Sequence, residues 1–356
     1  MSRGSYDRLD DALAILAPVE GLGNHGPMVA EALCALGRGD AVVGWVESYR
    51  KRFKPFRERG ATVHRIDEGN WGESLGKIER MEDWSQFFLR AIEESPWESV
   101  LDLWVQRLAP GFSAVAVHGA IRTCHAVRAL VERDTKLRRL GLADGLAHWA
   151  AGYAVLPEGV YGGEKLRPTE ALSRIEILPA DRRRPVKSIM QALQDLNGFE
   201  AFPPVIGMID ENRPVELLIS ELTEAFSRAF LANSNEFLET IAFVHSVTGP
   251  AGLRLIAAHV SEEAMRTLLR YAWQASAGIY VRFAVNPPVE SSETVEFDRE
   301  ELIAPENLID RAMACEEEHA VKFTEACLRE YQFDPKPIYL SAALRVVEVF
   351  SGKAAL

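Results

Sequence analysis

The chain has 356 residues, of which 47% are hydrophobic and 26% are charged, the composition of an ordinary globular protein. This composition excludes an intrinsically disordered chain, which combines low hydrophobicity with high net charge. The formal net charge of −12 argues against nucleic acid as a partner, because an acidic surface repels phosphate.

From the N-terminus onward, apolar residues recur with helical spacing. The segments that begin at residues 27 and 214 open with Pro27 and Pro214, at the position where the first turn of a helix tolerates proline. Asp144 is a candidate N-cap for a third segment. The expected helices cover residues 9–16, 27–36, 112–138, 144–155, 214–232, 235–247, 250–259, 262–278, 306–331 and 337–350.

Strand signals are scarce. Residues 41–46 suit either a short strand or a buried helix, 156–186 are expected to be irregular, and 286–305 are expected to form an exposed excursion. Neither of the last two stretches separates segments of different composition. We therefore predict one all-α domain over residues 1–356, a large multi-helix domain whose apolar stripes pack into a common core.

No apolar stretch approaches the length of a membrane span, and the N-terminus becomes acidic before any apolar run. The four cysteines form no Cys-x-x-Cys pair and are too few for a disulfide scaffold. These features predict a cytoplasmic protein with no membrane partner.

Two familiar motifs are present in incomplete form. Gly21-x-Gly23-x-x-Gly26 has the letters of a dinucleotide-binding loop but lacks the preceding strand. Glu316-x-x-His319 matches one half of a di-iron site, and no second Glu-x-x-His occurs. We disfavour both sites and expect residues 316–318 to form a mostly solvated face.

The eight histidines carry the strongest chemical signal. Several lie in apolar helical segments, where each buried imidazole needs a polar partner and a shared metal would satisfy several together. His118 and His125 are two helical turns apart, and Lys322 lies one turn after His319. Gly119 would allow a backbone or ligand to approach closely.

Four short pieces, in this order along nearly the whole chain, resemble the questin oxidase-like family. They are Asn24-His25-Gly26-Pro27, His118-Gly-Ala-Ile-Arg-Thr-Cys-His125-Ala, Phe243-Val-His245-Ser-Val-Thr-Gly249 and His319-Ala-Val-Lys322-Phe-Thr-Glu-Ala-Cys.

The resemblance implies an all-helical oxygenase that uses non-haem iron(II) and dioxygen on anthraquinones or related aromatic polyketides. It implies a metal site in the helical core made of four histidines and a lysine carboxylated by carbon dioxide. Iron(II) accepts imidazole readily and is usually given one carboxylate, which the lysine carbamate would supply. The implied ligands are His25, His118, His245, His319 and Lys322.

The sequence departs from the family at one position. Fungal members carry a second histidine four residues after the one matching His118, whereas this chain has Arg122. We therefore take His125 and Arg122 as candidate catalytic residues. Ring cleavage and Baeyer–Villiger insertion both fit the implied chemistry, with or without NADPH as an external reductant. Candidate walls for a flat substrate are Trp149, Tyr153, Phe243, Trp273 and Tyr280.

Two other classes of protein remain open from the sequence. A metal-dependent hydrolase with a carbamylated lysine would activate water at a similar ligand set, although this chain has no His-x-His on a barrel strand. A non-catalytic helical protein would use the histidines as core residues or as ligands of a structural metal.

Overall fold

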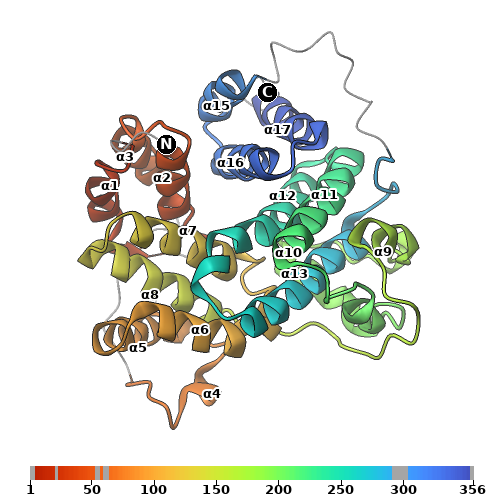
Figure 1. The fold of residues 1–356 in the computed structure, drawn as a ribbon, viewed down its shortest axis with the longest axis horizontal. Coiled ribbons are helices and arrows are strands. Elements are labelled where there is room, and N and C mark those ends of the chain that lie inside the picture. Colours follow the sequence, from red (N-terminus) through yellow and green to blue (C-terminus); the bar gives the residue numbers. More distant parts are fainter. Residues whose placement is uncertain (1–4, 21–22, 53–56, 59–63, 291–303, 353–356) are drawn as a thin grey trace. The chain divides into compact units, whose positions relative to one another are not determined.

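The computed structural model describes residues 5–20, 23–52, 57–58, 64–290 and 304–352. Within these ranges the protein is all-α, as the sequence predicts (Figure 1). The described strands β1 (Val19–Glu20) and β2 (Arg57–Glu58) form one short antiparallel pair. The absence of a parallel sheet among the described residues agrees with the rejection of a dinucleotide-binding fold.

By its internal contacts the chain divides into two compact units. The first contains residues 1–155 and 255–264, and the second contains residues 156–254 and 265–356. The chain therefore leaves the first unit, returns to it for ten residues, and leaves it again. In that returning segment, the backbone N–H of Ser261 donates to Asp102, and the His259 ring lies 5.3 Å from the Trp97 ring.

The helices of the first unit enclose a core in which α7 and α8 lie side by side (Figure 1) and α5 packs against α8. The α-helices of this unit are α1 (Leu9–Leu16), α2 (Gly26–Ala35), α3 (Val42–Arg52), α4 (Trp71–Ser74), α5 (Met81–Glu94), α6 (Trp97–Leu108), α7 (His118–Glu132) and α8 (Lys136–Ala151).

Glycines set the close approach of α7 to α8. A Cβ atom on Gly119 would lie 2.5 Å from the Trp149 Cα, and one on Gly145 would lie 2.9 Å from the Thr123 Cα. These are backbone atoms of the facing helix, so no rotamer change could relieve the overlap. The close backbone approach expected at Gly119 is thus confirmed.

The buried Arg138 on α8 connects α8 to α1 and to α7 through its hydrogen bonds. The Arg138 side chain is fully buried, and its Nε donates to Asp10 Oδ1 at 2.8 Å. Its two terminal nitrogens donate to the carbonyls of Ala129 and Tyr6. Each contact is needed, because a buried guanidinium without acceptors would lose its hydration uncompensated.

The second unit is built on α11, which packs against α12 and α17, while α12 and α17 both contact α16. The α-helices of this unit are α9 (Pro168–Arg174), α10 (Ile189–Leu193), α11 (Val215–Asn233), α12 (Phe237–Gly252), α13 (Glu262–Phe283, whose first turn belongs to the first unit), α15 (Pro305–Ala314), α16 (Glu318–Phe333) and α17 (Pro337–Ser351).

A buried ion pair joins two parts of this unit. Glu330 on α16 is fully buried, and both of its carboxylate oxygens accept hydrogen bonds from Arg254, each at 2.7 Å. The paired donors and acceptors have the fork geometry that makes such contacts strong.

Several expected helix boundaries need correction. Asp144 is not an N-cap but lies inside α8, which begins after Thr135, whose hydroxyl accepts from Arg138 N. Residues 42–46 belong to a helix, and residues 112–117 precede α7 in a non-helical turn. The helix expected over 306–331 is broken at Glu316, whose φ of 51° is left-handed. The expected excursion at 286–305 falls mostly on 291–303, outside the described residues.

The α7–α8 contact gives a direct stability test. Gly145→Ala should destabilise the protein by about 1–3 kcal/mol, because the new methyl group meets the α7 backbone. Gly141→Ala is the matched control on the same helix, since its new Cβ would lie 4.0 Å from Ala126. That change should be neutral or stabilising by up to about 1 kcal/mol. Urea denaturation measures both, and equal effects would contradict the proposed contact.

Candidate functional site

A left-handed turn precedes His118. Val115, Ala116 and Val117 have φ values of 49°, 54° and 70°, a region that costs an L-residue about 1–2 kcal/mol. Two of the three are β-branched, for which this conformation is exceptional. The turn packs closely against the C-terminal end of α8, where a Cβ atom on Gly152 would lie 2.2 Å from the Val115 side chain. Such strain persists only where the surrounding structure enforces it, and it is concentrated at functional sites.

The turn fixes the proton position of His118. The Val115 carbonyl accepts a hydrogen bond from His118 Nδ1 at 2.6 Å. A carbonyl oxygen can only accept, so Nδ1 carries the proton and Nε2 of the neutral ring carries the lone pair. Metal-binding histidines are commonly oriented by such a bond from the other ring nitrogen.

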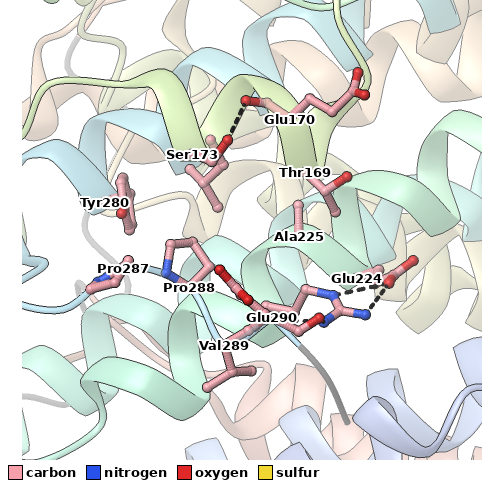
Figure 2. A pocket seen from close by; sticks show the side chains of 12 residues that line it. Thr169, Glu170, Ser173, Glu224, Ala225, Tyr280, Pro287, Pro288, Val289 and Glu290 are labelled. Atoms are coloured by element: carbon pink, nitrogen blue, oxygen red, sulfur yellow. Dashed lines mark hydrogen bonds and ion pairs between the residues drawn. The ribbon is translucent and has the colours of Figure 1, made fainter.

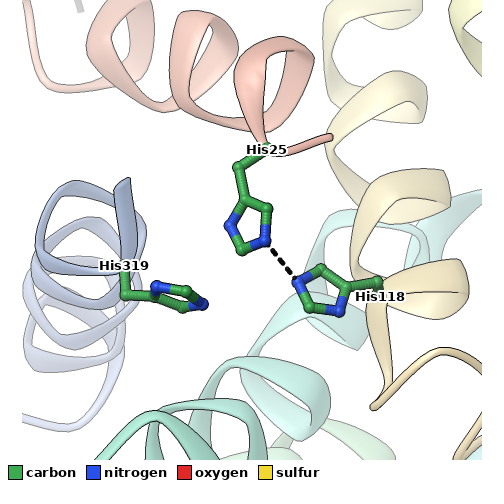
Figure 3. A group of neighbouring side chains, drawn as sticks. All are labelled: His25, His118 and His319. Carbon is green, nitrogen blue, oxygen red and sulfur yellow. Dashed lines mark hydrogen bonds between the residues drawn. The ribbon is translucent and has the colours of Figure 1, made fainter. Parts of the chain in front are cut away.

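His25 lies at the N-cap of α2, and its backbone N–H donates to the Tyr49 hydroxyl at 2.9 Å. Its Nε2 atom is 2.9 Å from Nε2 of His118, and a dashed line joins the two rings in Figure 3. Two nitrogen ligands about 2.1 Å from one ion, at a right angle, would be about 3 Å apart. The separation within the first unit therefore suits two adjacent ligands of one metal ion.

The second unit brings together His245 on α12 and His319 on α16. Their rings meet edge to face, with centroids 5.1 Å apart. His319 Nδ1 donates to Glu317 Oε1 at 2.6 Å, which leaves Nε2 with the lone pair. Glu317 stands at the N-cap of α16, directly after the left-handed Glu316. A carboxylate and a strained turn thus orient this histidine.

Lys322 lies one turn after His319 and is 2% exposed. Burial, opposed by the nearby carboxylates of Glu318 and Glu317, lowers the pKa of Lys322 from 10.5 to about 7. A substantial fraction of this amine is therefore neutral near neutral pH. The neutral form is the one that reacts with carbon dioxide or donates a lone pair to a metal.

The expectation of a solvated face at residues 316–318 is wrong for Glu317. Its side chain is 23% exposed and is hydrogen-bonded to His319. Burial would raise the pKa of Glu317, but the hydrogen bond from His319 opposes burial and the pKa is lowered. The sequence held no separate signal for this role, because a run of three glutamates is common on solvated helix ends.

Arg122 is held in a buried network of the first unit. Its Nη1 donates to His148 Nε2 at 3.0 Å, and its Nη2 donates to Asp144 Oδ2 at 3.3 Å. Asp144 also accepts from Ser85 at 2.6 Å. His148 is therefore a buried core histidine that is held by a hydrogen bond from the Arg122 side chain.

His125 is engaged with Glu31, to which its Nδ1 donates at 2.6 Å. Arg128 donates to both oxygens of the same carboxylate, at 2.5 and 2.6 Å. Arg122 and His125 line a cavity of about 20 Å³, enough for about one water molecule. An aromatic ring does not fit in this cavity, and the catalytic role of the two residues stays a prediction.

Glu31 is the charged centre of this cluster. Burial alone would raise the pKa of Glu31, but Arg128 and His125 outweigh it and lower the value from 4.5 to about 2. The carboxylate is therefore ionised at all physiological pH values. No sequence motif marks Glu31, which lies within the apolar segment of α2.

No protein-family model and no curated protein matches this chain. Within the described ranges, every helix is too short or too polar to cross a membrane.

The Glu31 cluster predicts a pH-dependent stability. The lowered pKa stabilises the folded state fully above pH 4.5, and this contribution is lost as the pH falls towards 2. Glu31→Gln should lower the free energy of unfolding by about 3 kcal/mol at pH 7. Urea denaturation should show that this difference shrinks by more than half at pH 3.

The exposed Glu47→Gln provides the control for Glu31→Gln. It should change stability little at either pH, because surface charges contribute little. A Glu31→Gln effect that is independent of pH would contradict the assignment of the shift to this carboxylate.

Proposed function

We propose that the protein is an iron-dependent oxidoreductase, an oxygenase that acts on an aromatic or quinone-like substrate with dioxygen. The proposed ligands are His25, His118, His245, His319 and Lys322, which the resemblance to the questin oxidase-like family assigns to one ion. The 2.9 Å separation of two Nε2 atoms in the first unit carries the proposal.

Each of the two units supplies histidine side chains whose chemistry suits a metal ligand. His118 Nδ1 donates a hydrogen bond to the Val115 carbonyl, and His319 Nδ1 donates one to the Glu317 carboxylate. In each neutral ring the Nε2 atom then carries the lone pair that a metal ion would accept. Imidazole nitrogens with one carboxylate suit iron(II) better than calcium or magnesium, which prefer oxygen ligands. Bound iron(II) would provide a path for electrons between an aromatic substrate and dioxygen.

Lys322 is suited to supply the anionic ligand. Its neutral amine can add carbon dioxide, which forms a C–N bond, releases one proton and converts the neutral amine into an anionic carbamate. The negative charge would balance part of the charge of a divalent ion in a buried position. An ammonium group at the same place would instead repel the cation.

Oxygen consumption tests the activity. The iron-loaded protein should consume dioxygen only when an anthraquinone is present, and a parallel reaction with NADPH shows whether an external reductant is used. Oxygen consumption that is unchanged by iron removal, or hydrolysis without oxygen uptake, would overturn the proposed reaction class.

Metal content tests the ligand set. Protein reconstituted with iron(II) and desalted should contain about one iron per chain by elemental analysis. His245→Ala should weaken iron binding at least about 100-fold, because it removes a direct ligand. His118→Ala should do the same from the first unit. The helical circular dichroism spectrum should be kept in both variants.

His259→Ala is the control for the metal measurement. His259 contacts Trp97 in the first unit and belongs to none of the four matched pieces. Its replacement should leave the iron content unchanged. Equal loss of iron in His259→Ala and His245→Ala would show that the histidines were assigned wrongly.

Lys322 gives a separate test of the carboxylated ligand. Lys322→Ala should abolish oxygen consumption, and acetate or bicarbonate should restore part of it by supplying a carboxylate. Lys322→Arg should also fail, because guanidinium stays charged and does not react with carbon dioxide. The exposed Lys187→Arg should keep full activity. Full activity of Lys322→Arg would exclude the carbamate.

A further inference from the structure

A second candidate site lies entirely within the second unit. An open pocket of about 460 Å³ is lined by residues of α9, α11, α13 and the segment 287–290 (Figure 2). This volume falls within the range of small-molecule sites. None of the proposed metal ligands lines the pocket.

The rim of the pocket is fixed before any ligand arrives. Arg228 on α11 donates from Nη1 to the carbonyls of Val289 and Glu290, at 3.0 and 2.7 Å. The backbone N–H groups of residues 285 and 286 donate to the side chain of the buried Asn233, at 2.8 and 2.9 Å. A rim held in this way reduces the ordering cost of binding.

Tyr280 provides a polar group that is aimed at this pocket and lacks a partner. Its side chain is 4% exposed and lines the pocket, yet its hydroxyl makes no hydrogen bond to any residue in the described ranges. Burial raises the pKa of Tyr280, so the hydroxyl stays protonated. A hydroxyl that opens onto the pocket and bonds to no described side chain can bond to a ligand there.

The charges around the pocket favour a cation. The residues that line the pocket include three carboxylates, Glu170, Glu224 and Glu290, and a single cation, Arg228. Arg228 is itself engaged with Glu224 at 2.7 Å, and Lys336 binds the other oxygen of Glu224 at 2.6 Å. The exposed carboxylates of Glu170 and Glu290 therefore dominate the rim.

We infer that this pocket binds a small organic cation with an aromatic or other apolar body. The body lies against the Tyr280 ring, Pro287 and Pro288, which Figure 2 shows among the lining side chains. The ammonium group lies at the rim near Glu170 and Glu290. The inference does not depend on the proposed metal site, because none of the proposed metal ligands lines the pocket.

Three matched probes test the inference by isothermal titration calorimetry: phenethylamine, 2-phenylethanol and 3-phenylpropionate. Phenethylamine should bind with a Kd of about 1 mM or below, the range for a ligand of this size. The neutral and anionic probes should bind at least about fivefold more weakly, because they lack the charge that the rim attracts. Equal binding of the three probes, or no binding of the amine at 10 mM, would overturn the inference.

Three variants locate the binding. Ser173→Trp fills the pocket from the exposed side of α9 and should abolish amine binding, whereas the exposed Leu217→Trp on α11 should leave it unchanged. Tyr280→Phe should weaken binding of the amine and the alcohol alike, since it removes the hydroxyl. Unchanged amine binding in Ser173→Trp would place the amine elsewhere and overturn the inference.

Glu170→Gln tests the contribution of the Glu170 charge to amine binding, because glutamine has nearly the same shape as glutamate. Glutamine can keep the contact in which Glu170 accepts from the backbone N–H of Arg167 at the start of α9. This variant should therefore fold normally and lose only a negative charge. Its affinity for phenethylamine should fall by about threefold, with the alcohol unaffected. An equal loss for both probes would contradict the role of the rim charge.

Discussion

Helix α7 begins at His118 because the three residues before it adopt a left-handed turn. That turn brings the Val115 carbonyl to Nδ1 of His118 and so determines which ring nitrogen is available for a ligand. The strain must be offset by the packing around it, where Gly152 accommodates Val115 and Gly119 lets Trp149 approach. The chemical state of one imidazole thus depends on the close fit of the surrounding helices.

Helix identity was largely predictable from the sequence, and helix ends were predictable where proline or glycine marks them. Pro27 and Pro214 stand in or just before the first turn of their helices, as expected. The breaks at residues 115–117 and at Glu316 were not predictable, because valine, alanine and glutamate rarely adopt left-handed backbone. These conformations are imposed by tertiary packing, which local sequence does not record.

In the candidate site, too, some features were predictable from the sequence and others were not. The four matched pieces singled out His25, His118, His245 and His319 as one set. Within the first unit the structure places His25 beside His118, and within the second it places His245 beside His319. The partners that orient them, the Val115 carbonyl and Glu317, carry no sequence signal. Glu31 is a similar case, since its contacts with His125 and Arg128 span more than ninety residues along the chain. Long-range pairing of buried charges follows from the fold and not from any local pattern.

The order of the two units along the chain has a consequence for biosynthesis. Residues 255–264 belong to the first unit, but they follow residues 156–254 of the second. During translation the first unit cannot be completed until a large part of the second has left the ribosome. The units therefore cannot fold as two successive, independent domains, as in proteins whose domains fold one after another from the N-terminus. The same interleaving explains why no linker was visible in the composition, and no single proteolytic cut would release either unit intact.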